Sequence, residues 1–213
     1  MDSIDNLRNS VREIDILLKY AARNTSDINK YQLFNKISIV LLSTKLEVFI
    51  EEFMEEHVGM QLNNHTIDTF PKELKNNYFD RGVELIAEKK KRIEKDGIFR
   101  IMVTLCGNNI SNISELRKIC PPIKFNYGKH GQKEIEDLFE RHGLGIFIKS
   151  QDAQNCLKMI NSLISIRNNV IHQDATPGLT HQTIADHKKN VLLFADHLEM
   201  DLQHNKQNYY NQI

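Results

Sequence analysis

The sequence predicts an all-α protein: a bundle of four long core helices with an insertion of shorter helices in the middle third. Glycine and proline number only 9 and 4 in 213 residues, so few positions can interrupt a helix. Apolar residues recur at helical spacing, whereas no segment alternates as a strand does. With 40% hydrophobic and 26% charged residues, the chain is globular rather than disordered. Its length fits one domain spanning residues 1–213.

Two long helices are expected in the first third. Ile4, Leu7 and Val11 begin an amphipathic pattern over residues 3–22. The polar residues 24–27 then form a turn that also offers helix caps. A second helix is expected over 28–58, ending near Gly59. Because its middle is apolar nearly all round, it is expected to lie centrally and to be covered on several sides.

The middle third is expected to hold the shorter helices. Pro71 can open a charged helix over 71–95, and a short apolar run follows at 98–106. A further helix from Ser114 is stopped by the Cys-Pro-Pro at 120–122. The helix at 132–141 ends at a glycine-rich stretch. The last two long helices are expected at 151–172 and 181–204, before a polar, frayed tail at about 205–213.

Composition narrows the function classes. The 28 Lys+Arg and 28 Asp+Glu sum to zero, which excludes a globally basic nucleic-acid coat, so any anion must be held by a local patch. Three cysteines without C-x-x-C spacing indicate neither a disulfide framework nor a zinc knuckle. Nine histidines without H-E-x-x-H indicate scattered surface or structural residues rather than a metal site, so neither metal nor cofactor is predicted. The polar N-terminus and the absence of a 20-residue apolar run predict a cytoplasmic protein with no membrane contact.

The most informative segment is the helix around residues 156–174. On a helical wheel, Arg167 falls near the middle of the apolar half, which includes Ile166, Val170 and Ile171. Asn168 and His172 stand one turn apart on the opposite edge. An arginine on an apolar face is costly unless its charge is paired with a carboxylate or reaches solvent at an interface. It is either a structural arginine paired with a core carboxylate or an anion-binding arginine at a cleft or subunit interface.

The spacing of Arg167-Asn168-x-x-x-His172, within RNNVIH, resembles the R-x4-6-H signature of the HEPN family, and more narrowly its RiboL-PSP-type branch. The flanking KEIEDLFERHGLG at 133–145 and STKLEVFIEEF at 43–53 also look like that branch. The resemblance covers most of the chain, although its most specific motif is the single hexapeptide RNNVIH. It implies a HEPN-like helical bundle.

The resemblance also implies a homodimer that cleaves RNA without metal. In that family the Arg and His of two subunits meet in a cleft at the dimer seam. The 2′-hydroxyl attacks its neighbouring phosphate and leaves 2′,3′-cyclic phosphate and 5′-hydroxyl ends. Arg167 would stabilise the phosphate, His172 would act as acid and base, and Asn168 would position them. The expected setting is a toxin or an anti-phage defence system, with a possible antitoxin or defence-system partner.

Several points of this assignment remain open in the sequence. Arg167 and His172 lie about 140° apart on an ideal helix. They can converge through the arginine's reach, through a distorted last turn, or most naturally by pairing across the dimer. Some HEPN toxins carry a tyrosine two places after the histidine, where this chain has Asp174, which puts neutralisation by tyrosine modification in doubt. Asp174 could instead pair with His172. Glu47 is a candidate to hold Arg167, or else lines a solvated groove.

The run EKKKRIEKD at 88–96 is either an RNA-binding patch or an ordinary solvated helix. Two other function classes also remain. One is a non-catalytic HEPN-like module that binds a nucleotide, an RNA or a protein through Arg167. The other is a helical scaffold in which Arg167 forms a buried ion pair.

Overall fold

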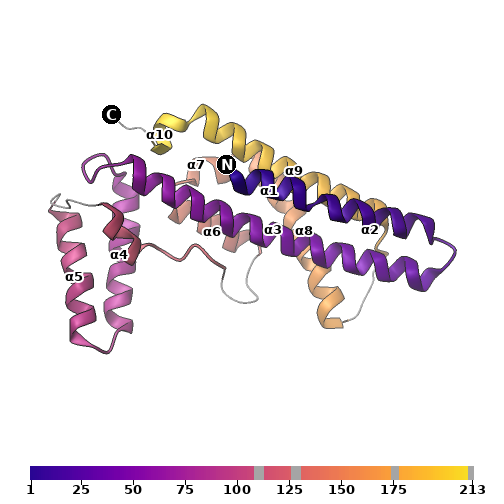
Figure 1. The fold of residues 1–213 in the computed structure, drawn as a ribbon, viewed down its shortest axis with the longest axis horizontal. Helices are drawn as coiled ribbons and strands as arrows, with labels where there is room; N and C mark the ends of the chain where they lie inside the picture. Colours follow the sequence, from indigo (N-terminus) through magenta and orange to yellow (C-terminus); the bar gives the residue numbers. More distant parts are fainter. Residues whose placement is uncertain (108–112, 126–130, 174–177, 211–213) are drawn as a thin grey trace.

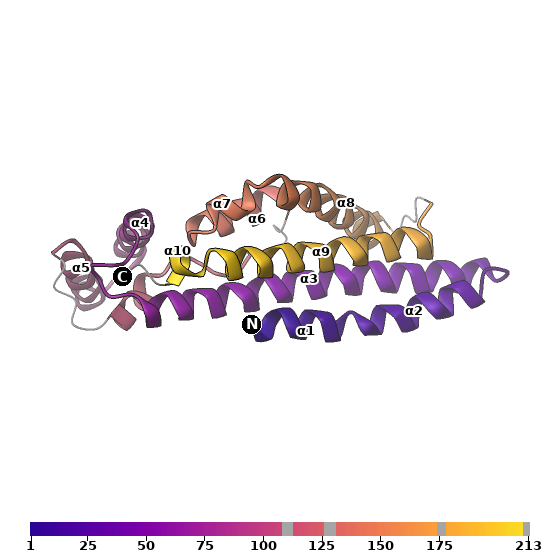
Figure 2. The same ribbon diagram turned by 90° about the horizontal axis from the view of Figure 1, so that it is seen from above.

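A computed structural model describes residues 1–107, 113–125, 131–173 and 178–210, and within these ranges every regular element is a helix and there is no strand. The long helices form an elongated bundle (Figures 1 and 2). It consists of the end-to-end pair α1 (Asp2–Ser10) and α2 (Arg12–Arg23), then α3 (Ile28–Asn64), α8 (Gln151–Gln173) and α9 (His181–His204). Helices α3 and α9 lie between α1–α2 on one side and α8 on the other, as Figure 2 shows. The predicted all-α class is confirmed.

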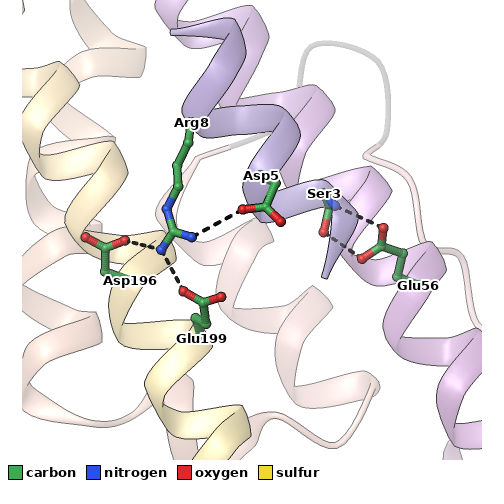
Figure 3. Close-up of polar contacts among 6 residues, drawn as sticks. All are labelled: Ser3, Asp5, Arg8, Glu56, Asp196 and Glu199. Atoms are coloured by element: carbon green, nitrogen blue, oxygen red, sulfur yellow. Dashed lines mark hydrogen bonds and ion pairs between the residues drawn. The ribbon is translucent and has the colours of Figure 1, made fainter.

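The N-terminal segment differs from the expected single helix because it breaks at Val11, which keeps helical dihedrals but separates α1 from α2. Polar contacts fasten α1 to the bundle (Figure 3). Arg8 Nη2 donates to Asp196 Oδ1 at 2.7 Å and to Glu199 Oε2 at 2.6 Å, both on α9. The buried Ser3 donates from its backbone N and its hydroxyl to the Glu56 carboxylate on α3, at 2.9 Å each.

Helix α3 is the longest element and continues past Gly59, so the expected end at that glycine is wrong. Asp27 caps its start by accepting from the Lys30 backbone N at 3.2 Å. The main core surrounds its middle, where the Phe53 and Phe139 rings stack at 5.9 Å. As expected, α3 packs against helices on several sides, namely α1, α2, α8 and α9. The exposed side chains of Leu33, Ile37 and Val48 share an open flank of this helix.

The insertion builds a second core at one end of α3. It comprises α4 (Lys72–Glu88), α5 (Arg92–Cys106) and the short 3-10 helix η1 (Ile113–Ile119). Tyr78 of α4 is fully buried there, among Leu74, Ile98 and Leu116. The helix expected over 71–95 is therefore two helices, and the apolar run at 98–106 is the second half of α5. Helices α4 and α5 form a hairpin that projects from the bundle (Figure 1).

Two shorter helices return the chain to the bundle: α6 (Gln132–Arg141), at its predicted position, and α7 (Gly145–Ile148). Gly143, between them, has φ 84°, which explains why the glycine-rich stretch stops α6. The expectation of a frayed tail is wrong up to residue 210, because α10 (Lys206–Tyr210) follows α9 and buries Tyr209 and Tyr210. Of the helices described, none is long and apolar enough to cross a membrane.

Candidate active site

The candidate site lies at the C-terminal end of α8, where the helix leaves the bundle (Figure 1). The buried face of α8 carries Leu157, Ile160 and Ile164 among other core residues. Arg167 lies one turn beyond Ile164, in the middle of this face, and is half-buried. One turn further along the same face, Ile171 is 45% exposed. The guanidinium therefore stands where the core ends and solvent begins.

Arg167 is held by its chain neighbour. Its Nη1 donates to Oδ1 of Asn168 at 2.9 Å, and Asn168 is also half-buried. In the described part of the chain, no carboxylate forms an ion pair with Arg167. A guanidinium has five donor hydrogens, and one bond to a neutral amide leaves most of them for another group. This arrangement suits an arginine that binds an anion better than one that closes a core ion pair.

His172 is exposed in the last turn of α8 and presents its imidazole to solvent. Helix α8 stays α-helical through Gln173, so no distorted last turn brings His172 round to Arg167. The angular separation of about 140° therefore persists. Of the three routes to convergence, the reach of the arginine and pairing between two subunits remain.

Glu47 lies on the side of α3 that faces α8. It is half-buried, and it lines a small crevice together with Ser43 and Ile164. This position is one turn of α8 away from Arg167, whose guanidinium binds Asn168 instead. The neighbouring Glu51 accepts from the Phe125 backbone N at 3.1 Å. A supporting role for Glu47 stays a prediction, and Asp174 lies outside the described residues.

Apolar side chains near the end of α8 and in the first turns of α3 are exposed, which was not predicted from the sequence. The helical wheel places Ile171 on the apolar half of α8, yet its side chain is 45% exposed. On α3, Leu33 and Ile37 are 54% and 42% exposed. The bond from Asn35 Nδ2 to the Leu179 carbonyl places this part of α3 beside the chain that follows α8. The sequence offers one indication of such exposed apolar surface: α3 carries more apolar residues than a single buried face requires.

The histidines away from α8 divide as expected into structural and surface residues. His57, His65, His142 and His187 are buried polar residues of the bundle. Burial lowers the pKa of His57 to about 3 and that of His142 to about 4, because a charged imidazole would lose its hydration. Across the described ranges, no three His, Cys, Asp or Glu side chains cluster as a metal site. Burial raises the pKa of the Cys156 thiol to about 11, which disfavours a reactive thiolate there.

An all-helical bundle with an Arg-Asn-x-x-x-His motif at the projecting end of a core helix defines a HEPN-type protein. The sequence model of the RiboL-PSP-HEPN family matches residues 5–204, and the chain belongs to this family. HEPN domains are generally associated with ribonucleases. No curated protein and no solved structure shows a significant match to the chain.

Proposed function

We propose that the protein is a metal-independent endoribonuclease whose catalytic residues are Arg167 and His172, with Asn168 positioning the arginine. The observation that carries this proposal is the half-buried Arg167 at the edge of the core. It binds only a neutral amide among the described residues, and it lies on the same helix end as an exposed histidine. Membership of a ribonuclease-associated family supports the same chemistry.

The proposed reaction needs two proton transfers and one anion site. The 2′-hydroxyl oxygen attacks the adjacent phosphorus and loses its proton to an imidazole. The bond between phosphorus and the 5′ oxygen breaks, and that oxygen gains a proton from an imidazolium. The products are a 2′,3′-cyclic phosphate and a 5′-hydroxyl. Arg167 stabilises the additional negative charge on the phosphorane through its planar fork of donors.

A homodimer fits this chemistry better than a single subunit. Within one chain, Arg167 and His172 diverge along an undistorted helix. In a two-fold dimer, two copies of α8 meet, and His172 of one subunit acts first as base and then as acid beside the partner subunit's Arg167. The exposed Ile171, together with Leu33 and Ile37, supplies apolar surface for such a contact.

The proposal includes a biological setting and partners. We place the enzyme in a toxin or an anti-phage defence system, with RNA as substrate and with an antitoxin or defence-system protein as a possible regulator. This part rests on the family alone. A cytoplasmic location is part of the same proposal, because cellular RNA is its substrate.

The test is an RNA cleavage assay on the purified protein with excess EDTA. We expect cleavage that resists the chelator and yields 2′,3′-cyclic phosphate and 5′-hydroxyl ends. Mass measurement of the same sample should give a dimer. Loss of cleavage in EDTA, or products with 5′-phosphate ends, would contradict the proposal.

A non-catalytic HEPN module remains the second candidate. It is favoured by the exposure of His172, to which no described residue gives an orienting hydrogen bond. RNA binding that requires Arg167 but not His172, without cleavage, would identify this alternative.

A further inference from the structure

The basic run at 88–96 lies at the tip of the α4–α5 hairpin, and it does not form the continuous solvated helix considered from the sequence. Helix α4 ends at Glu88 and α5 begins at Arg92, so Lys89, Lys90 and Lys91 form the connection. Every residue from 87 to 94 is exposed. The hairpin therefore carries three consecutive lysines and Arg92 away from the bundle into solvent (Figure 1).

The tip has a positive charge that its own acidic residues do not cancel. Residues 88–96 contain five basic and three acidic side chains, whereas the whole chain sums to zero. Lys89 pairs with Glu94 and Arg92 with Asp96, each at 3.9 Å and in solvent, where such pairs are weak. In the described ranges, Lys90 and Lys91 form no ion pair at all.

The basic residues at the tip are not needed to stabilise the hairpin. Lys91 and Arg92 stand at the start of α5, where the helix dipole disfavours positive charge. The hairpin is held instead by its buried side, through Tyr78, Ile98 and Met102. Beside the cations, Ile93 is 86% exposed and contributes almost nothing to that core.

The tip also faces the same way as the candidate site. In Figure 1, the α4–α5 hairpin and the C-terminal end of α8 both project from the lower side of α3. A flexible polyanion that occupies the end of α8 can therefore extend along this side toward the hairpin.

We propose that Lys89, Lys90, Lys91 and Arg92 form an RNA-binding arm that holds the substrate's sugar-phosphate backbone away from the cleaved bond. The proposal rests on the proposed function, because it supplies the substrate class. Lysine contacts to phosphates carry no sequence information, so the arm contributes affinity and not base preference. Exposed Ile93 offers an apolar surface to an unstacked base.

The test measures RNA binding in a His172→Ala background, which prevents cleavage during the measurement. The probe is a mixed-sequence single-stranded RNA of about 30 nucleotides, titrated at several salt concentrations. The arm variant is Lys90→Gln/Lys91→Gln/Arg92→Gln. The matched control, Arg12→Gln/Lys19→Gln/Arg23→Gln, removes the same charge from exposed positions on α2.

We expect the arm variant to bind at least about tenfold more weakly in 0.1 M salt, because each lost phosphate contact removes counterion release. Each phosphate contact to a single strand contributes about 0.7 to the magnitude of the slope of log affinity against log salt. Loss of three contacts should therefore reduce that magnitude by about 2. The control should change neither quantity as much. Equal binding by the arm and control variants would overturn the proposal and leave the tip as a surface for a protein.

Failure of the arm and failure of the enzyme give different results. Cleavage by the wild-type protein together with unchanged binding by the arm variant overturns the arm alone. Arm-dependent binding without any cleavage by the wild-type protein supports the arm and contradicts the ribonuclease.

Discussion

Replacement of His172 by alanine is expected to lower RNA cleavage by about 10²–10⁴-fold, the usual contribution of a positioned acid or base. Imidazole is a common general acid and base in catalysis, and the His172 side chain is exposed to solvent at the end of α8. The fold should survive, because exposed residues away from packing change stability by about 0.5 kcal/mol or less. Cleavage rates and urea denaturation of both proteins measure the two effects.

His204→Ala is the matched control for this variant. His204 is also exposed in the last turn of a long helix, and its Nδ1 donates to the Met200 carbonyl of its own helix at 2.7 Å. It should retain full activity. Equal cleavage by the His172→Ala protein and the wild type would exclude His172 from the chemistry.

The second large effect is a loss of stability in mild acid, caused by two histidines buried at one end of the bundle. His57 Nε2 lies 3.0 Å from the His142 carbonyl, which can only accept, so Nε2 carries the proton. Nδ1 of His57 then accepts from the Tyr210 hydroxyl at 2.6 Å. His142 Nε2 donates to the Pro122 carbonyl at 3.3 Å, and its buried Nδ1 has no partner. Both rings are therefore built into the core as neutral species.

The sign of the effect follows from the two pKa values. Burial lowers the pKa of His57 to about 3 and that of His142 to about 4, below the value of about 6.5 in an unfolded chain. The unfolded state therefore binds more protons in mild acid. The stabilisation is complete above about pH 6.5 and is lost as the pH falls toward 4. In this pH range, each of these histidines lowers the free energy of unfolding by about 1.4 kcal/mol for each unit by which the pH falls. This loss is large compared with a typical free energy of unfolding of about 5–15 kcal/mol.

Urea denaturation at pH 7 and pH 5 measures this loss. His142→Gln should reduce the pH dependence, because it removes one of the buried rings whose pKa is lowered. Gln61→Leu is the control, since the Gln61 amide donates to the same His142 carbonyl at 3.0 Å but does not titrate. It should lower stability by a similar amount at both pH values. Equal free energies of unfolding for the wild type at pH 7 and pH 5 would contradict this account.

Periodicity predicted the elements that pack along one face. Helices α6 and α9 lie at their predicted positions, and α8 ends within one residue of its prediction. The prediction that α3 ends at Gly59 failed because a glycine inside a helix costs only about 1 kcal/mol. Packing of the buried Val58 and Leu62 offsets that cost. The break at residues 89–91 contains neither glycine nor proline. It exists because Ile98 and Met102 must fold back onto Tyr78, a tertiary requirement that local sequence does not contain.

The candidate site was predictable in part. The wheel correctly placed Arg167 on the inward face of α8, because that result depends only on helix geometry. Wheel geometry could not show that Ile171 is exposed while the neighbouring Val170 stays in the core, or that Arg167 forms no ion pair among the described residues. Nor could it show the bond between Arg167 and Asn168, because adjacent residues point about 100° apart on a helix. The long side chain of arginine spans that angle.

The most direct test of a composite site mixes two inactive variants. Arg167→Ala and His172→Ala proteins are unfolded together and refolded, and chelator-resistant RNA cleavage is measured on the mixture. In a mixed dimer, one subunit keeps His172 and the other keeps Arg167. If the two residues act across the dimer seam, the mixture regains cleavage that neither variant shows alone. No recovery, with mixed dimers verified by mass, would contradict catalysis by Arg167 and His172 of different subunits.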